Sequence, residues 1–302
     1  MTAAAEYEAY VRDAGGERCI RSILVANNGM AASKFIMSIR NWLFERFGDA
    51  SLIRIVSMAT SEDIRANAMH LHHADSFVEV PAGANFNNYA NVEVIVRLAR
   101  ENRVDAVWPG WGHASENPAL PQALEANGIT FVGPTDKAMF LLGDKIASTI
   151  IAESAGVPCV SWSGTGVRVE PDASGHVTVP DDKFAEACVT SAEQAVEVAE
   201  RVGYPIMIKA SEGGGGKGVR MATKKEQIAP MYQAVCDEVK GSPVFLMRLC
   251  TGARHIEIQL MADKKGNVAV LSGRDCSMQR RFQKIVEEGP PRAVAPETLD
   301  QM

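Results

Sequence analysis

The feature that most constrains the fold is an alternation of short apolar runs and helix-period stretches along the N-terminal half of the chain. Apolar runs of strand length begin at Ser22, Leu52, Ser76, Asp105 and Ile129, and a stretch with helical periodicity follows each of them. Alternating strands and helices of these lengths indicate a parallel sheet whose two faces are covered by helices. The sequence therefore predicts an α/β domain here.

The C-terminal half has a different order of elements. The predicted elements are a helix over 135–155, an exposed Gly-, Pro- and Ser-rich insertion over 163–180, a helix over 192–202, and strands over 205–210, 243–249, 255–262 and 268–272, with a hairpin turn at 264–267. Pro230 lies in a helix-period stretch that ends at Val239, so it predicts a kink or the true start of that helix.

Composition excludes several classes of partner. Of the 302 residues, 46% are hydrophobic and 23% charged, and the net charge of −6 gives no reason to expect nucleic acid or an anionic membrane as a partner. We find no apolar run of membrane-spanning length and no signal peptide. The six cysteines are scattered and form no C-x-x-C pair, which favours reduced thiols over a disulfide framework or a zinc site.

A run of glycines between two apolar segments is the sharpest local signal. It consists of Gly213, Gly214, Gly215 and Gly216, followed by Lys217 and Gly218. Successive glycines bring backbone N–H groups close to a bulky anion such as a polyphosphate, and the apolar flanks argue against a flexible linker. A P-loop would need glycine at the position of Ser211 and Ser or Thr directly after Lys217, so that motif is absent. Strand, glycine loop and strand together predict a hairpin lid over phosphates.

Two lysines that precede this run are candidates for binding an anion. Lys209 closes an otherwise apolar strand, an unusual place for a solvated charge unless the side chain faces an anion. Lys145 follows Gly143 and Asp144 and, taken alone, is more typical of a solvated helix lysine.

Two polar stretches follow further along the chain. Period-two alternation places His255, Glu257 and Gln259 on one face of a strand. This face is either exposed to solvent or lines a ligand-binding site. Residues 274–284 carry four cations and few apolar residues, so they predict either a solvated loop or a basic wall for anionic substrates.

Three histidines, His70, His72 and His73, invite a metal-site interpretation. On a helix, side chains at these spacings spread around the surface and do not converge on one ion, although His70 and His73 could pair. We therefore do not favour a metal site there.

Taken together, the motifs resemble those of the biotin carboxylase family. Their sequences are similar to those of eukaryotic multidomain acetyl-CoA carboxylases. The resemblance covers nearly the whole chain and rests on six motifs in order: VANNGMAA (25–32), NNYANV (87–92), WPGWGHASENP (108–118), GDK (143–145), IKASEGGGGKG (208–218) and RDCSMQRR (274–281).

The resemblance implies an α/β fold with a Rossmann-like pre-ATP-grasp domain followed by an incomplete ATP-grasp domain. Its implied organisation is an N-terminal extension at 1–17, a biotin carboxylase N-terminal domain at 18–140 and an ATP-grasp domain at 141–302. It also implies that ATP and Mg²⁺ activate bicarbonate and that biotin, carried on another domain, is then carboxylated as the first half-reaction of acetyl-CoA carboxylase. The implied partners are a biotin carrier domain and a carboxyltransferase domain, with a homodimer as one candidate assembly in the cytoplasm, or in a plastid if residues precede Met1.

Carried over by motif, the resemblance implies roles for single residues. Those implied to contact the nucleotide are Lys145, Lys209, Gly213, Gly214, Gly215, Gly216, Lys217, Gly218, Met247, Arg248, Leu249, His255 and Gln279, and Lys284 matches a lysine at the bicarbonate site. The family's metal-binding carboxylates and remaining catalytic residues fall beyond Met302, and Glu287 and Glu288 do not match them. We therefore expect no metal ligand in this chain and no activity from it alone.

Phe282 stands where family members usually have His, which puts one polar contact near the phosphates in doubt. Two other functions stay open: an ATP-grasp ligase that joins a carboxylate to an amine, and a non-catalytic nucleotide-binding module.

Overall fold

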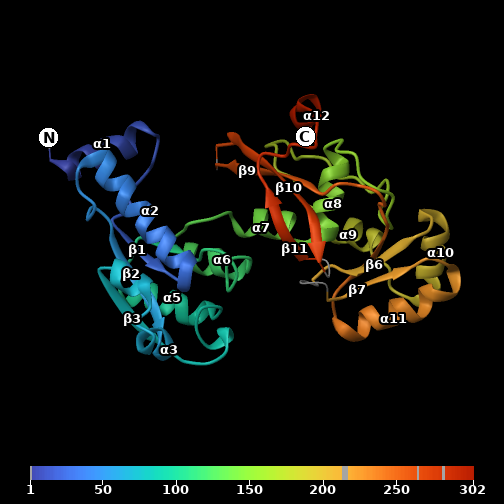
Figure 1. The fold of residues 1–302 in the computed structure, drawn as a ribbon, viewed down its shortest axis with the longest axis horizontal. Coiled ribbons are helices and arrows are strands. Elements are labelled where there is room, and N and C mark those ends of the chain that lie inside the picture. Colours follow the sequence, from blue (N-terminus) through green and yellow to red (C-terminus); the bar gives the residue numbers. More distant parts are fainter. Residues whose placement is uncertain (1, 213–216, 264, 281–282) are drawn as a thin grey trace. The chain divides into compact units, whose positions relative to one another are not determined.

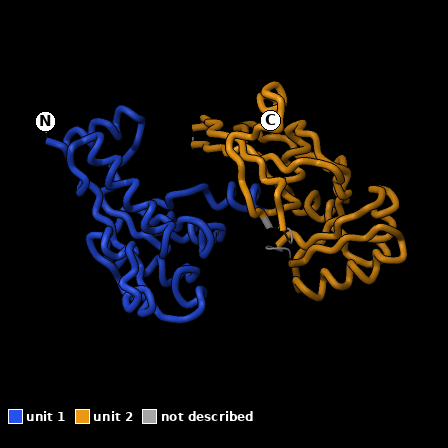
Figure 2. Tube along the Cα trace, viewed as in Figure 1, with its two compact units in different colours: residues 1–143 blue, residues 144–302 orange. Residues whose placement is uncertain are grey.

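The computed structural model describes residues 2–212, 217–263, 265–280 and 283–302. They divide between Gly143 and Asp144 into two compact units, coloured separately in Figure 2. The boundaries drawn from the sequence at 17/18 and 140/141 stay a prediction. In the described part of the chain, no helix is long and apolar enough to cross a membrane.

The first unit contains one five-stranded sheet in which every neighbouring pair of strands is parallel, in the order β3-β2-β1-β4-β5. Figure 1 labels its strands β1, β2 and β3. The strands are β1 (Ser22–Val25), β2 (Arg54–Thr60), β3 (Ser76–Val80), β4 (Ala106–Trp108) and β5 (Thr130–Phe131). The predicted parallel α/β sheet is confirmed, and its strand order is that of a Rossmann-like half.

Helices cover both faces of this sheet. They are α1 (Ala3–Asp13), α2 (Gly29–Phe47), α3 (Ser61–Arg65), α4 (Met69–His73), α5 (Val92–Glu101), α6 (Ala119–Glu125) and α7 (Asp136–Gly143), with a 3-10 turn, η1 (Asn85–Asn87). Leu24 packs in one core cluster with residues of α5 and α6, whereas Ile23 and Val25 pack in another with residues of α1 and α2. Successive side chains of β1 therefore enter opposite cores, which is why Ile23, Leu24 and Val25 are all apolar.

Several polar side chains lie close together at the N-terminus of α3. Thr60 and Asp63 form a capping box, and the Tyr89 hydroxyl donates to Asp63 Oδ2 at 2.8 Å. His70 is fully buried, so placing all three neighbouring histidines on the surface was wrong for this one. The pKa of His70 is lowered by burial, against the opposing influence of the Asp63 carboxylate, and burial lowers the pKa of His113 in the same way.

This burial predicts an acid-sensitive fold. A histidine whose pKa is lower in the folded state stays neutral while the unfolded chain takes up a proton below about pH 6.5, so stability is lost as the pH falls through that value, by at most about 1.4 kcal/mol per pH unit for each group. We expect His70→Gln to flatten the decrease in thermal midpoint between pH 7.5 and 5.5. The exposed His176→Gln is the matched control. An unchanged slope in His70→Gln would contradict this assignment.

The second unit contains two three-stranded antiparallel sheets, β7-β6-β8 and β11-β10-β9. The strands are β6 (Ile206–Ala210), β7 (Val219–Ala222), β8 (Val244–Arg248), β9 (Ile256–Ala262), β10 (Val268–Arg280) and β11 (Gln283–Glu288). The helices are α8 (Lys145–Ser154), α9 (Asp181–Ala187), α10 (Ala192–Val202), α11 (Ile228–Glu238) and α12 (Pro296–Gln301), with a 3-10 turn, η2 (Lys225–Gln227). Pro230 falls in the first turn of α11, so it marks the start of that helix.

The single helix predicted over 135–155 was wrong, because α7 and α8 are separate helices. Asp144 has an extended backbone, with φ −75° and ψ 129°, and its side chain caps α8 by accepting from the amides of Ile146 and Ala147. A capping aspartate needs a non-helical backbone, so the helical pattern on either side of it cannot continue through it.

The insertion predicted to be exposed is buried in its first part. Val167 and Val169 pack in one core cluster with Trp162, Ile150 and Phe245, whereas residues 171–176 are exposed. The prediction was wrong there because single valines separated by polar residues show no periodicity. These valines nevertheless pack against α8 and β8.

The basic stretch at 274–284 is not a loop within its described residues. β10 continues to Arg280 and pairs with β11, so the strand predicted at 268–272 was too short. Arg274 of β10 pairs with Glu287 of β11, and Lys284 of β11 pairs with Glu257 of β9, which apolar patterning cannot reveal.

Candidate phosphate-binding and anion-binding site

The first candidate site begins at the hairpin of β6 and β7, in which Lys209 pairs with Val219. Gly213, Gly214, Gly215 and Gly216 lie outside the described residues. Gly218 does not, and its φ is +67°; a Cβ added there would lie 2.8 Å from both Ala210 Cβ and Val239 Cγ2. Only glycine fits this position without strain, because both the backbone conformation and the space exclude a side chain.

Two lysines converge at the end of β6. The half-buried Lys209 has its Nζ 5.5 Å from the centre of the Phe245 ring, and burial together with the nearby Lys145 charge lowers the pKa of Lys209. Lys145 Nζ donates to the Ser211 carbonyl oxygen. Within the described ranges, no carboxylate forms an ion pair with Lys209. Two ammonium groups held together in this way are stabilised by an anion bound between them.

The far end of the glycine run is held by Glu238. Its carboxylate accepts from the Gly218 amide at 2.9 Å and pairs with Arg220 at 2.9 Å. The hydrogen bond from Gly218, followed by the charges of Arg220 and Lys217, lowers the pKa of Glu238. Lys217 is exposed beside this anchor.

Met247, Arg248 and Leu249 lie at the end of β8, on the same sheet as Lys209. Met247 pairs with Met207 of β6 and forms an isolated bridge with Trp162. The Leu249 amide donates to the Pro205 carbonyl at 2.8 Å. The structure therefore brings this segment and Lys209 to one three-stranded sheet, and Lys145 of α8 reaches the end of β6 through Ser211.

The other sheet brings His255, Gln279 and Lys284 together. A hydrogen bond of 3.0 Å joins Gln279 Nε2 to His255 Nδ1, and Gln279 pairs in register with Lys284 across β10 and β11. Lys284 Nζ donates to Glu257, and this hydrogen bond raises the pKa of Lys284. Lys284 is thus a fixed positive charge. Phe282, the departure from the family pattern, lies outside the described residues.

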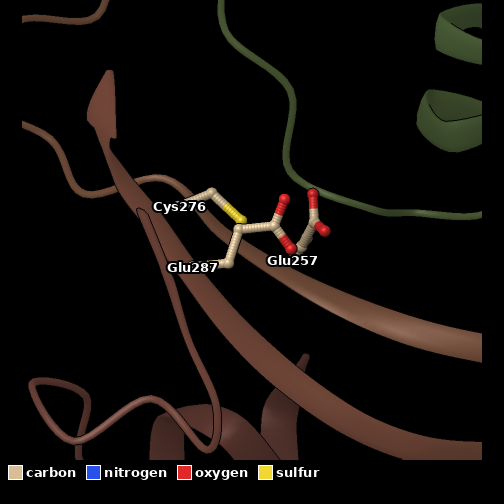
Figure 3. Close-up of side chains that lie close together, drawn as sticks. All are labelled: Glu257, Cys276 and Glu287. Atoms are coloured by element: carbon tan, nitrogen blue, oxygen red, sulfur yellow. The ribbon is translucent and has the colours of Figure 1, made fainter. Parts of the chain in front are cut away.

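Glu257, Cys276 and Glu287 lie close together beside this lysine, with ligand atoms within 4.8 Å of one another (Figure 3). The carboxylates are already engaged, because Arg274 pairs with both and Lys284 pairs with Glu257. A thiol is also a poor ligand for Mg²⁺, which prefers oxygen. This trio therefore does not fit a magnesium ion, and we interpret it as an ion-pair network that orients Lys284.

Sequence reasoning missed Asp144, Glu238 and Arg274 as members of these sites. Asp144 was visible only as part of the GDK motif, and Glu238 only as a polar residue of a helix-period stretch. Arg274 was included in the basic stretch without a partner, because its partners Glu257 and Glu287 are 17 and 13 residues away. The alternation that placed Glu257 on a polar face was the one signal that could have suggested the pairing.

Two family models match this chain. The family model described as "Biotin carboxylase, N-terminal domain" matches residues 19–139, and that described as "Carbamoyl-phosphate synthase L chain, ATP binding domain" matches residues 173–302. Acetyl-CoA carboxylase 1 of Arabidopsis thaliana is 54% identical over 95% of this chain, and acetyl-CoA carboxylase of Saccharomyces cerevisiae is 50% identical over 97% of it. The chain belongs to the biotin carboxylase family.

Solved biotin carboxylases share its fold. The biotin carboxylase domain of Hydrogenobacter thermophilus 2-oxoglutarate carboxylase, in complex with MgADP, ADP and bicarbonate, is 32% identical over 94% of this chain, with a TM-score of 0.78. Campylobacter jejuni biotin carboxylase gives the same TM-score at 29% identity. The second unit thus has an ATP-grasp fold. The chain spans 13% of the length of the two acetyl-CoA carboxylases and 56–57% of the two solved chains.

Proposed function

We propose that this chain supplies the nucleotide-binding part of a biotin carboxylase, which carboxylates biotin with bicarbonate at the expense of ATP in the first half-reaction of an acetyl-CoA carboxylase. The observation that carries the proposal is the pair of lysines, Lys145 and Lys209, held at the end of β6 with no carboxylate joined to Lys209 in the described chain. A polyphosphate carries the negative charge that such a pair would bind. Its oxygens also accept hydrogen bonds from backbone N–H groups, which a glycine run can supply.

Each residue predicted from the motifs has a role in this proposal. Lys145 and Lys209 bind phosphate oxygens, and Lys217, Gly218 and the preceding glycines cover them. Met247, Arg248 and Leu249 line the base of the nucleotide. His255 and Gln279 hold the nucleotide from the second sheet, and Lys284 attracts bicarbonate. The resemblance supplies these roles, and the hydrogen bonds of Gln279 and Lys284 support them.

The chemistry required is phosphoryl transfer followed by carboxyl transfer. A bicarbonate oxygen attacks the terminal phosphorus of ATP, the bond to ADP breaks, and carboxyphosphate forms. A ureido nitrogen of biotin then forms a bond to the carboxyl carbon, releasing phosphate and one proton. Lys145 and Lys209 offset the charge on the phosphate oxygens, and Lys284 holds the bicarbonate anion in place. Mg²⁺ would supply further charge neutralisation in such reactions, although the trio beside Lys284 does not fit it.

The partners follow from the same proposal. They are a biotin carrier domain and a carboxyltransferase domain of the same protein, with a homodimer of the carboxylase part. All six cysteines are free thiols in the structure, which supports a reducing compartment such as the cytosol.

A different ATP-grasp ligase is the second candidate. It is favoured by the match of residues 173–302 to the ATP-binding domain of a carbamoyl-phosphate synthase, which is named for another carboxylate-activating enzyme. In that case the acyl phosphate would be captured by an amine.

The discriminating experiment measures ATP cleavage and fixation of labelled bicarbonate in the protein that carries this sequence. We expect label to appear on free biotin, ATP cleavage to require bicarbonate, and Lys209→Ala to lower both signals strongly. Label transferred to an amine, with biotin inert, would favour the second candidate. ATP binding without cleavage under either condition would support a non-catalytic module.

A further inference from the structure

Asp144 connects the two elements that carry the paired lysines. Its Oδ1 atom accepts from the backbone amides of Ile146 and Ala147 at 2.9 and 2.8 Å, at the start of α8. Its Oδ2 atom accepts from the Ser211 hydroxyl at 2.6 Å, just beyond the end of β6. One carboxylate thus joins a helix start to a strand end 67 residues away.

Capping alone does not account for this arrangement. The cap uses only Oδ1, and serine or threonine would cap the helix about as well as aspartate does. Oδ2 is directed to Ser211, which is 3% exposed, so this second hydrogen bond is shielded from competing water. A hydrogen bond to a charged group in such a place is among the stronger ones in a protein.

The connection joins the two segments that carry the lysines. Lys145 directly follows Asp144, and Lys209 precedes Ser211 by two residues. Lys145 Nζ also donates to the Ser211 carbonyl oxygen, so Ser211 is held by both residues of the pair 144–145. Like charges repel, and without this link α8 and the end of β6 would be free to move the two ammonium groups apart.

We propose that Asp144, acting through Ser211, is a positioning residue that holds Lys145 and Lys209 at the spacing a polyphosphate requires. This inference rests on the proposed function, because it assumes that the two lysines bind the phosphates of ATP. Asp144 itself carries the wrong charge to touch a phosphate, so its effect is exerted only through its neighbours.

The test uses Asp144→Ser, which keeps a cap but is too short to reach Ser211, and Ser211→Ala, which leaves the cap intact. Isothermal titration of the 302-residue chain with ATP and with AMP gives the readout. We expect each variant to bind ATP about threefold to tenfold more weakly, and the double variant to be no weaker than the weaker single one, because both remove the same hydrogen bond. AMP affinity should change less than about twofold, since AMP lacks the two phosphates farthest from the nucleoside.

A second cycle separates positioning from a merely structural role. In a Lys145→Ala background, Ser211→Ala should have little further effect on ATP affinity, because the lysine being positioned is absent. Equal losses for AMP and ATP, or full additivity with Lys145→Ala, would overturn the inference. If the unmodified chain binds ATP and both single variants bind it equally well, the inference fails but the proposed function stands. If the unmodified chain does not bind ATP, both fail.

Discussion

Replacing Lys209 by alanine is expected to weaken ATP binding to this chain by about tenfold to 150-fold, because a charge-assisted hydrogen bond to phosphate contributes roughly 1.5–3 kcal/mol. The half-buried position of Lys209 places this loss towards the upper end, since little water can replace the ammonium group. Removing the Lys209 charge also removes its electrostatic repulsion with Lys145, so we expect no loss of fold stability.

The measurement is a titration with ATP at constant ionic strength, with thermal unfolding as the check on folding. Lys240→Ala is the matched control, because Lys240 is an exposed lysine of the same unit. We expect the control to bind ATP as the unmodified chain does. Equal affinities for Lys209→Ala and Lys240→Ala would mean that Lys209 does not face the phosphates.

Gly218→Ala is expected to lower the free energy of unfolding of the second unit by about 2–5 kcal/mol. Left-handed backbone costs an alanine about 1–2 kcal/mol, and forcing a methyl group into occupied space costs about 1–3 kcal/mol more. A steric clash is expected here, because the new Cβ would lie 2.8 Å from Ala210 Cβ and from Val239 Cγ2.

Gly241→Ala provides a control that separates these two costs. Gly241 also has a positive φ, +82°, but an added Cβ there meets nothing within 4 Å. Chemical denaturation should therefore show the smaller, conformational loss for Gly241→Ala and the larger loss for Gly218→Ala. If the two variants lose the same stability, close packing is not the reason for glycine at 218.

The sequence was a sufficient guide where one physical rule dominates. Apolar runs such as residues 22–26 predicted the parallel sheet, because a strand buried on both faces must be apolar throughout. The apolar run before Lys209 likewise predicted the strand β6 that holds this lysine, whereas its contact with an anion stays a prediction. In both cases the signal lies within a few consecutive residues.

The sequence was insufficient where a structure depends on distant partners. The break between α7 and α8 depends on Asp144, whose side chain bonds to Ser211 as well as to its own helix. The sheet β11-β10-β9 carries ion pairs such as Lys284 of β11 with Glu257 of β9, which are 27 residues apart. No local pattern encodes such pairs, so a charged strand was interpreted as a loop or an anionic-substrate wall.

The central claim is that Lys145 and Lys209 at the end of β6 form the phosphate site of a biotin carboxylase. A crystal structure of the chain with a non-hydrolysable ATP analogue tests it most directly. The account predicts analogue phosphate oxygens within hydrogen-bond distance, about 2.7–3.2 Å, of both lysine Nζ atoms, with the base beside Met247 and Leu249. Phosphates bound elsewhere on the chain, with Lys145 and Lys209 both turned to solvent, would contradict it.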